Sequence, residues 1–77
     1  MEVFQSGGTE TTRIGYVNRN FQLCTGHRGL AGNDHEQLSY RLLCLEVSCG
    51  HVYGANGTDV FQRRCPACQA GAAGIAF

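Results

Sequence analysis

The chain has 77 residues, among them 11 Gly and five Cys, and its six Arg balance six acidic residues with no Lys present. A chain of this length forms one domain at most, and its hydrophobic core alone stabilises a fold by only about 3–5 kcal/mol, so a further cross-link is expected. Zero net charge predicts a poor general nucleic-acid binder, because sequence-independent binding requires the neutralisation of many phosphates, and it leaves open only a local arginine patch.

Neither a membrane anchor nor a disulfide framework is predicted. No segment approaches the ~18–20 consecutive apolar residues that span a bilayer, and the first residues, MEVFQSGGTETTR, lack the basic start and apolar run of a signal peptide. The cysteines are odd in number and grouped as two pairs plus one, which suits an intracellular metal site better than disulfides. We therefore expect reduced thiols, no membrane contact and a cytoplasmic location.

The N-terminal third divides into an arm and a hairpin. Residues 1–12 are polar and lack periodicity, so they predict a mobile arm. From residue 13 onward RIGYV alternates apolar and polar positions, and FQLC does the same after the turn-prone NRN. A short β-hairpin is therefore predicted between residues 13 and 24.

A loop of unusual length follows at residues 25–37, TGHRGLAGNDHEQ. It contains three Gly and two His and has neither hydrophobic period. Long loops of this kind often carry function, so His27 and His35 are candidate partner-binding residues. The loop also raises two hypotheses about chemistry.

The first hypothesis is a second metal site that includes Cys24. Cys24 and His27 have ligand spacing, and His35 with Asp34 or Glu36 would complete four positions. The alternative is a buried core thiol at Cys24 and solvated histidines. The stronger expectation is this alternative.

The second hypothesis is a nuclease. Asp34 and His35, in NDH, resemble the Asp-His start of HNH-type nuclease sites, where a His activates water beside a divalent cation. Such sites need a following helix with further ligands, and the chain after His35 enters the cysteine region instead. Enzymatic activity is therefore the alternative interpretation, and no catalytic residue is assigned.

The cysteine region is predicted as a second hairpin. LSYRLLCLEV places Leu38, Tyr40, Leu42 and Cys44 on one strand face, although a helical pattern also fits. The turn formers GANGTD follow, and VFQRR leads back to the last two cysteines. We expect two strands with a cysteine turn at the base of each.

The spacing of four cysteines predicts zinc. Cys44-x4-Cys49 is followed after fifteen residues by Cys65-x2-Cys68, and two thiolate pairs at this separation form tetrahedral zinc sites. The wide first gap leaves an alternative open, in which His51 replaces Cys44 as a ligand and Cys44 is a small buried apolar residue.

Around these cysteines, CGHVY and CPAC resemble the two knuckles of zinc-ribbon and rubredoxin-like proteins, over residues 38–70. YVNRN, NDHEQ and YGANGTD add a similarity to short bacterial zinc-ribbon proteins of no clear function. The resemblance implies a zinc-ribbon β-hairpin with one Zn²⁺, or iron as in the electron-carrying rubredoxins. The chain departs from the family in its four-residue first gap and in Gln69, where Gly is common. Four thiolates leave no coordination position open, which is typical of structural zinc.

The expected protein is a small β-rich, metal-stabilised domain at residues 13–70, between the arm at 1–12 and a small-residue tail at 71–77. Zinc ribbons commonly use their hairpin faces to contact a larger protein or nucleic acid, and Arg suits specific phosphate or guanine contacts. The expected function is that of an adaptor or accessory subunit that binds a larger protein within a nucleic-acid-handling assembly. The candidate partner-binding residues are Arg63, Arg64, Tyr53, His27 and His35.

Overall fold

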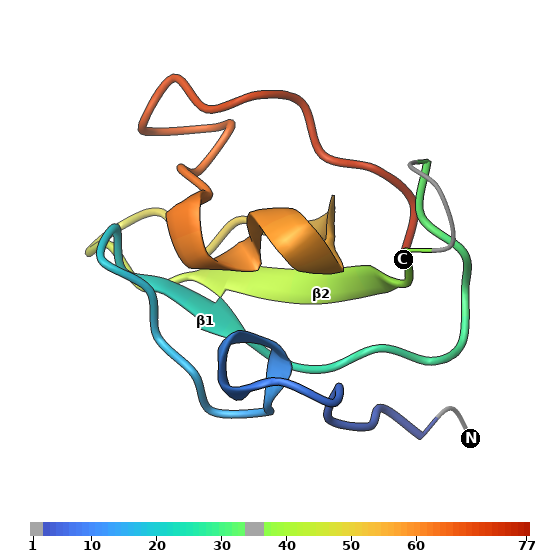
Figure 1. The fold of residues 1–77 in the computed structure, drawn as a ribbon. Coiled ribbons are helices and arrows are strands. Elements are labelled where there is room, and N and C mark those ends of the chain that lie inside the picture. The colour runs from blue at the N-terminus through green and yellow to red at the C-terminus, as the bar shows by residue number, and fades with distance from the viewer. Residues whose placement is uncertain (1–2, 34–36) are drawn as a thin grey trace.

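The computed structural model describes residues 3–33 and 37–77. In these residues three antiparallel strands form one sheet in the order β1-β2-β3: β1 (Gln22–Cys24), β2 (Ser39–Cys44) and β3 (Val52–Asn56). Two 3-10 helices accompany the sheet, η1 (Glu10–Thr12) and η2 (Gly57–Gln62). Figure 1 shows η2 lying over one face of the sheet. No helix in this described part of the chain is long and apolar enough to cross a membrane.

The core lies between the sheet and η2. Alternation along β2 turns Tyr40, Leu42 and Cys44 to the same buried face, as the strand pattern predicts. Val60 of η2 is fully buried against this face. The core cluster is small, consisting of Cys24, Tyr40, Leu42, Tyr53, Ala55 and Val60. A core of this size explains why a further cross-link is needed.

The predicted turn at residues 18–20 is present, but its first arm is short. Val17 and Leu23 form a single antiparallel bridge, and the N–H of Cys24 donates to the carbonyl of Tyr16 at 2.8 Å. The second arm, β1, pairs with β2 through its other edge. The N-terminal hairpin therefore adds β1 to the sheet.

The predicted second hairpin is wrong in one arm. The segment VFQRR, expected to return as a strand, begins inside η2, and β3 pairs with β2 instead. The turn that joins the paired strands is therefore the first cysteine turn, residues 45–51. Two features favour the helical turn: Asp59 lies in its first turn, where a carboxylate is favourable, and Val60 faces the core.

Both ends of the chain contact the sheet region. Gln5 and His27 exchange two backbone hydrogen bonds of 2.8 and 2.9 Å. At the other end Ile75 bridges the free edge of β3, where its N–H donates to the carbonyl of Gly54 at 3.0 Å, and the hydroxyl of Ser39 donates to the carbonyl of Ala76. The division into arm, domain and tail at residues 12 and 70 stays a prediction.

Candidate metal centre

Four cysteines from three places in the chain meet beside one end of the sheet. Cys44 is the last residue of β2, Cys49 lies in the turn before β3, and Cys65 and Cys68 follow η2. Their four Sγ atoms lie within 4.8 Å of one another. The Sγ atoms of Cys44 and Cys68 are 3.6 Å apart, and those of Cys49 and Cys65 are 3.7 Å apart.

These separations match metal coordination. A disulfide would require an S–S distance of about 2.05 Å, and all five cysteines are free thiols. A tetrahedral zinc with Zn–S bonds of about 2.3 Å holds its sulfur atoms about 3.8 Å apart. The cluster could therefore hold a metal ion with little rearrangement.

The backbone around the sulfur atoms donates hydrogen bonds to them. The Sγ of Cys65 accepts the N–H of Ala67 at 3.3 Å, and Cys44 and Cys49 accept backbone hydrogen bonds from Glu46 and His51, each two residues ahead. N–H donors stabilise a thiolate, because hydrogen bonds to a charged group favour the charged form. The turns therefore suit negatively charged sulfur ligands.

Left-handed backbone lets these turns close. Gly50, directly after Cys49, has φ of 65°, a left-handed conformation that glycine adopts at little cost. In the second turn the left-handed residue is Ala70, with φ of 55°, one position beyond Gln69. The left-handed conformation thus falls on Ala70, and the side chain of Gln69 remains available to accept the N–H of Cys65.

The four thiols of the cluster do not ionise equally. Burial raises the pKa of Cys44, but hydrogen bonds from Gln22, from the Glu46 backbone and from neighbouring thiols outweigh it and leave the pKa lowered. The pKa of Cys68 is raised, mainly by its contact with Cys49 and then by burial. The neighbouring groups therefore favour ionisation of the Cys44 thiol and oppose ionisation of the Cys68 thiol. A bound cation would reverse this and release protons.

Gln22 links the cysteine cluster to the core, and the sequence analysis did not identify it. This fully buried side chain donates through Nε2 to the Sγ of Cys44 at 3.3 Å and to the carbonyl of Asn20 at 2.9 Å. Its Oε1 accepts the hydroxyl of Tyr53 at 2.8 Å. The sequence offers one slight indication of this role, a polar Gln between apolar residues of a predicted strand. The structure pairs Gln22 directly opposite Cys44.

Gln69 supports the other cysteine pair. Its Oε1 accepts the N–H of Cys65 at 2.8 Å, and its Nε2 donates to the carbonyl of Asn20 at 2.9 Å. Gln22 and Gln69 also contact each other, Nε2 to Oε1, at 3.3 Å. The two cysteine turns are therefore connected by side chains as well as by sulfur.

His51 is not a member of the group of four clustered cysteines. Its ring stacks on Tyr53 with centroids 5.7 Å apart and an interplanar angle of 12°, and the clustered group includes Cys44. The choice between Cys44 and His51 as the fourth ligand stays a prediction.

The candidate partner-binding residues divide between interior and surface. Tyr53 is only 4% exposed, and burial raises its pKa to about 12. The Arg63 guanidinium lies 5.0 Å from the centre of the Tyr53 ring and donates through Nη2 to the carbonyl of Ala72 at 2.6 Å. Arg64 is exposed, and His27 is half-buried with its ring edge-on to Tyr40. His35 lies outside the described residues.

Cys24 does not join the cluster. It is fully buried in the core, burial raises its pKa, and it accepts a backbone hydrogen bond from Gly26. Across residues 3–33 and 37–77 the only metal-competent group is the four-cysteine cluster. His27, the second described residue of that proposed site, accepts the N–H of Gly29 at its Nδ1 at 3.0 Å and packs edge-on to Tyr40. The remaining candidates, Asp34, His35 and Glu36, and with them the Asp34-His35 nuclease motif, lie outside the described residues.

Comparison with known proteins finds no matching family model, no matching curated protein and no matching solved structure.

Proposed function

We propose that this chain is a small adaptor or accessory subunit whose fold is organised by one structural Zn²⁺ bound to Cys44, Cys49, Cys65 and Cys68. The observation that carries the proposal is the set of four Sγ atoms within 4.8 Å of one another, supplied with N–H donors. Four sulfur ligands complete a tetrahedral zinc and leave no position for substrate or water. The metal's role is then to hold the fold.

The energetic argument supports the same role. Structural zinc contributes on the order of 10–16 kcal/mol in small domains, as much as the ~5–15 kcal/mol total stability of an ordinary protein. The small core cannot supply this alone. Four cysteines also bind iron, which would make the chain a rubredoxin-like electron carrier, and the experiment below distinguishes the two metals.

Binding to a larger protein within a nucleic-acid-handling assembly is the second part of the proposal. The balanced charge argues against independent nucleic-acid binding, whereas exposed arginines such as Arg13, Arg19 and Arg64 suit a few specific contacts. We expect no measurable salt dependence of binding to random DNA or RNA. If the affinity for random DNA or RNA fell steeply with salt concentration, the proposal of a protein partner would be wrong and direct nucleic-acid binding would take its place.

The test of the metal is elemental mass spectrometry on protein purified without chelator. We expect one zinc per chain in the wild type and in Cys24→Ala, whose cysteine lies outside the cluster. Cys68→Ala removes a surface ligand and should retain substoichiometric zinc. Iron in place of zinc would support electron transfer, and wild-type protein without any bound metal would contradict the proposal.

A further inference from the structure

An apolar row crosses the face of the sheet that η2 leaves open. Val17 pairs with Leu23, Leu23 with Leu43, and Leu43 with Val52, each directly opposite in antiparallel register. Residues paired in this way point to the same face, and their neighbours Cys24, Leu42 and Tyr53 point to the core. Val17 and Val52 are each 43% exposed.

A second row extends this surface toward the metal centre. The N–H of Leu45 donates to the carbonyl of Phe21 at 2.8 Å, which continues the pairing of β1 with β2 by one step. Phe21 is 59% exposed and Leu45 43%. At the opposite end of the face, the guanidinium of Arg41 lies over the ring of Phe4 in the N-terminal arm. The Arg41 Cζ atom is 3.6 Å from the centre of that ring. We call the uncovered residues the outer apolar patch: Val17, Phe21, Leu23, Leu43, Leu45 and Val52.

Phe21 is held in a backbone conformation that a bulky residue rarely adopts. Its φ is 62°, in the left-handed region where Gly or Asn is usual. The turn before it is fixed by Asn18, whose Oδ1 accepts the N–H groups of Asn20 and Gln22 at 2.8 and 3.0 Å and whose Nδ2 donates to the carbonyl of Val60 at 2.8 Å. The fold thus presents an exposed aromatic ring on a rigid support. Strain of this kind concentrates at functional surfaces, and rigid aromatic side chains make effective anchors.

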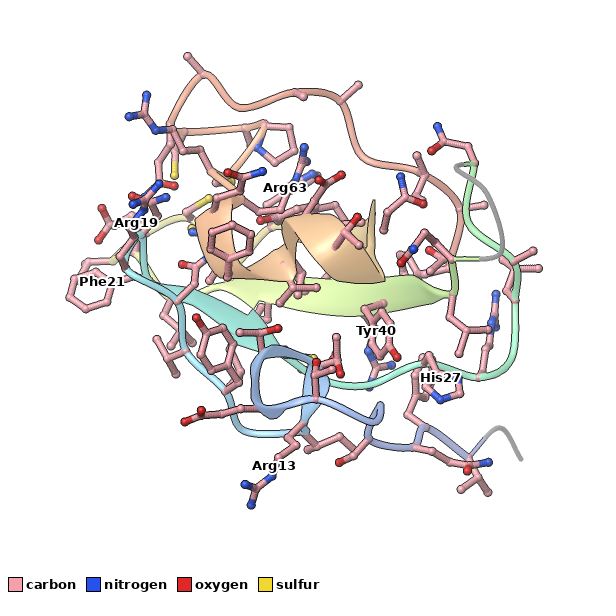
Figure 2. The ribbon with its side chains drawn as sticks, in the orientation of Figure 1. Arg13, Arg19, Phe21, His27, Tyr40 and Arg63 are labelled. Carbon is pink, nitrogen blue, oxygen red and sulfur yellow. The ribbon has the colours of Figure 1, made fainter. Side chains whose placement is uncertain are left out.

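The charges beside the patch are complementary to each other. Arg19 lies two residues before Phe21, and Glu46 directly follows Leu45. Figure 2 shows Arg19 and Phe21 at the same end of the molecule. In the described residues neither Arg19 nor Glu46 forms an ion pair. At the end of the patch formed by Phe21 and Leu45, the adjoining residues along the chain thus supply one cation, Arg19, and one carboxylate, Glu46, whereas Arg41 at the opposite end of the face is covered by the ring of Phe4.

We propose that the outer apolar patch is the interface of a two-fold symmetric homodimer, in which Arg19 of each copy pairs with Glu46 of the other. A two-fold interface uses the same surface on both copies, so the surface must be complementary to itself. An apolar centre with one charge of each sign meets this condition, whereas a patch with one sign would repel its copy. Zero net charge on the whole chain also removes long-range repulsion. This inference goes beyond the adaptor role and does not depend on which metal is bound.

The first test measures mass in solution by sedimentation equilibrium on the metal-loaded full chain. We expect a concentration-dependent rise from 8.3 kDa to twice that mass. Phe21→Gly removes the anchor and relieves the positive φ, so it should fold and raise the dimer dissociation constant by about tenfold or more. Phe61→Ser is the matched control, because Phe61 is similarly exposed, at 44%, but belongs to η2 on the opposite face.

The second test exchanges the charges. Arg19→Glu alone and Glu46→Arg alone should each be monomeric, because each homodimer would contain two like-charge contacts. An equimolar mixture of the two variants restores both ion pairs across the two-fold axis and should form a heterodimer. The double variant R19E/E46R should dimerise with itself.

Three results would overturn the proposal. These are a wild-type chain that stays monomeric at every concentration, a dimer that Phe21→Gly leaves unchanged, or single charge variants that fail to associate when mixed. Metal content is measured on each sample, so a failure of the zinc proposal is seen separately as metal-free or iron-loaded protein. If the chain bound one zinc but stayed monomeric, the homodimer proposal would be wrong, and the outer apolar patch would instead be a binding surface for a different protein.

Discussion

At the scale of single residues, Gln22 joins two parts of the protein that are far apart in the sequence. Its amide nitrogen donates to the sulfur of Cys44, while its amide oxygen accepts from the hydroxyl of Tyr53. Side chains that hydrogen-bond to metal ligands orient them and adjust their basicity. Gln22 therefore connects the cysteine cluster, through Cys44, with the core, through Tyr53.

We expect Gln22→Leu to weaken metal binding by about 10–100-fold, because Cys44 loses a donor that lowers its pKa and the Tyr53 hydroxyl loses its buried acceptor. Affinity is measured by competition with a chromophoric chelator. Gln62→Leu changes an exposed glutamine and should leave affinity unchanged. Equal affinities for both variants would show that the Gln22 hydrogen bond does not affect the metal.

Phe21 permits a prediction about stability that is separate from association. In the monomer, Phe21→Gly should raise the free energy of unfolding by about 0.5–1 kcal/mol, because relief of a left-handed conformation exceeds the entropic cost of glycine. Denaturant unfolding of dilute, metal-loaded protein measures this. Phe61→Gly, in a helical segment, should have the opposite sign. A destabilised Phe21→Gly monomer would mean that the ring's own contacts outweigh the strain.

At the scale of elements, the cysteine turns act as connections between strands. The turn at residues 45–51 joins β2 to β3, so the first two cysteines lie at the end of a paired hairpin. The hydrogen bond from the N–H of Cys44 to the carbonyl of His51, at 2.9 Å, closes this turn. The second cysteine turn follows η2 directly. A metal ion at the cluster would thus hold η2 against the sheet.

The C-terminal tail depends on the absence of a side chain at Gly54. A Cβ at this position would lie 2.3 Å from the carbonyl oxygen of Ile75 and 2.9 Å from the Ser39 hydroxyl. We expect Gly54→Ala to displace the tail and lower the free energy of unfolding by about 1–3 kcal/mol. Limited proteolysis of the tail and denaturant unfolding measure the two effects.

Gly8→Ala is the control for this substitution, because a Cβ there has nothing within 4 Å. It should match the wild type in both measurements. If Gly54→Ala also matched the wild type, the tail would not pack on the edge of β3 as described.

At the scale of the whole molecule, a metal bound to the four-cysteine cluster would make stability depend on pH. Bound metal holds the thiols deprotonated, which lowers their pKa in the folded state below the unfolded value, so the stabilisation is present at neutral pH and is lost as pH falls. We expect chelator or mild acid to unfold the sheet and η2 together. Circular dichroism measures the loss, and added Zn²⁺ at neutral pH should restore the signal. An unchanged thermal midpoint in chelator would contradict this dependence.

The sequence predicted some elements of the fold correctly and others not. The alternation of Tyr40, Leu42 and Cys44 identified β2, because a two-residue period is a local signal. The pairing of β3 was misassigned, since GANGTD resembles a hairpin turn and only the contact of Val60 with the core decides for η2. Gln22 was missed, because a single polar residue in a strand gives no indication of its partner.

The sequence by itself placed four cysteines in two short turns, since a thiol pair separated by a few residues and the glycine after Cys49 act locally. Its length also predicted a small core, which the structure has. Only the tertiary structure decided which strands pair, because pairing depends on contacts between distant segments. In the same way it set Val17, Leu23, Leu43 and Val52 in one exposed row, which no local period in the sequence reveals.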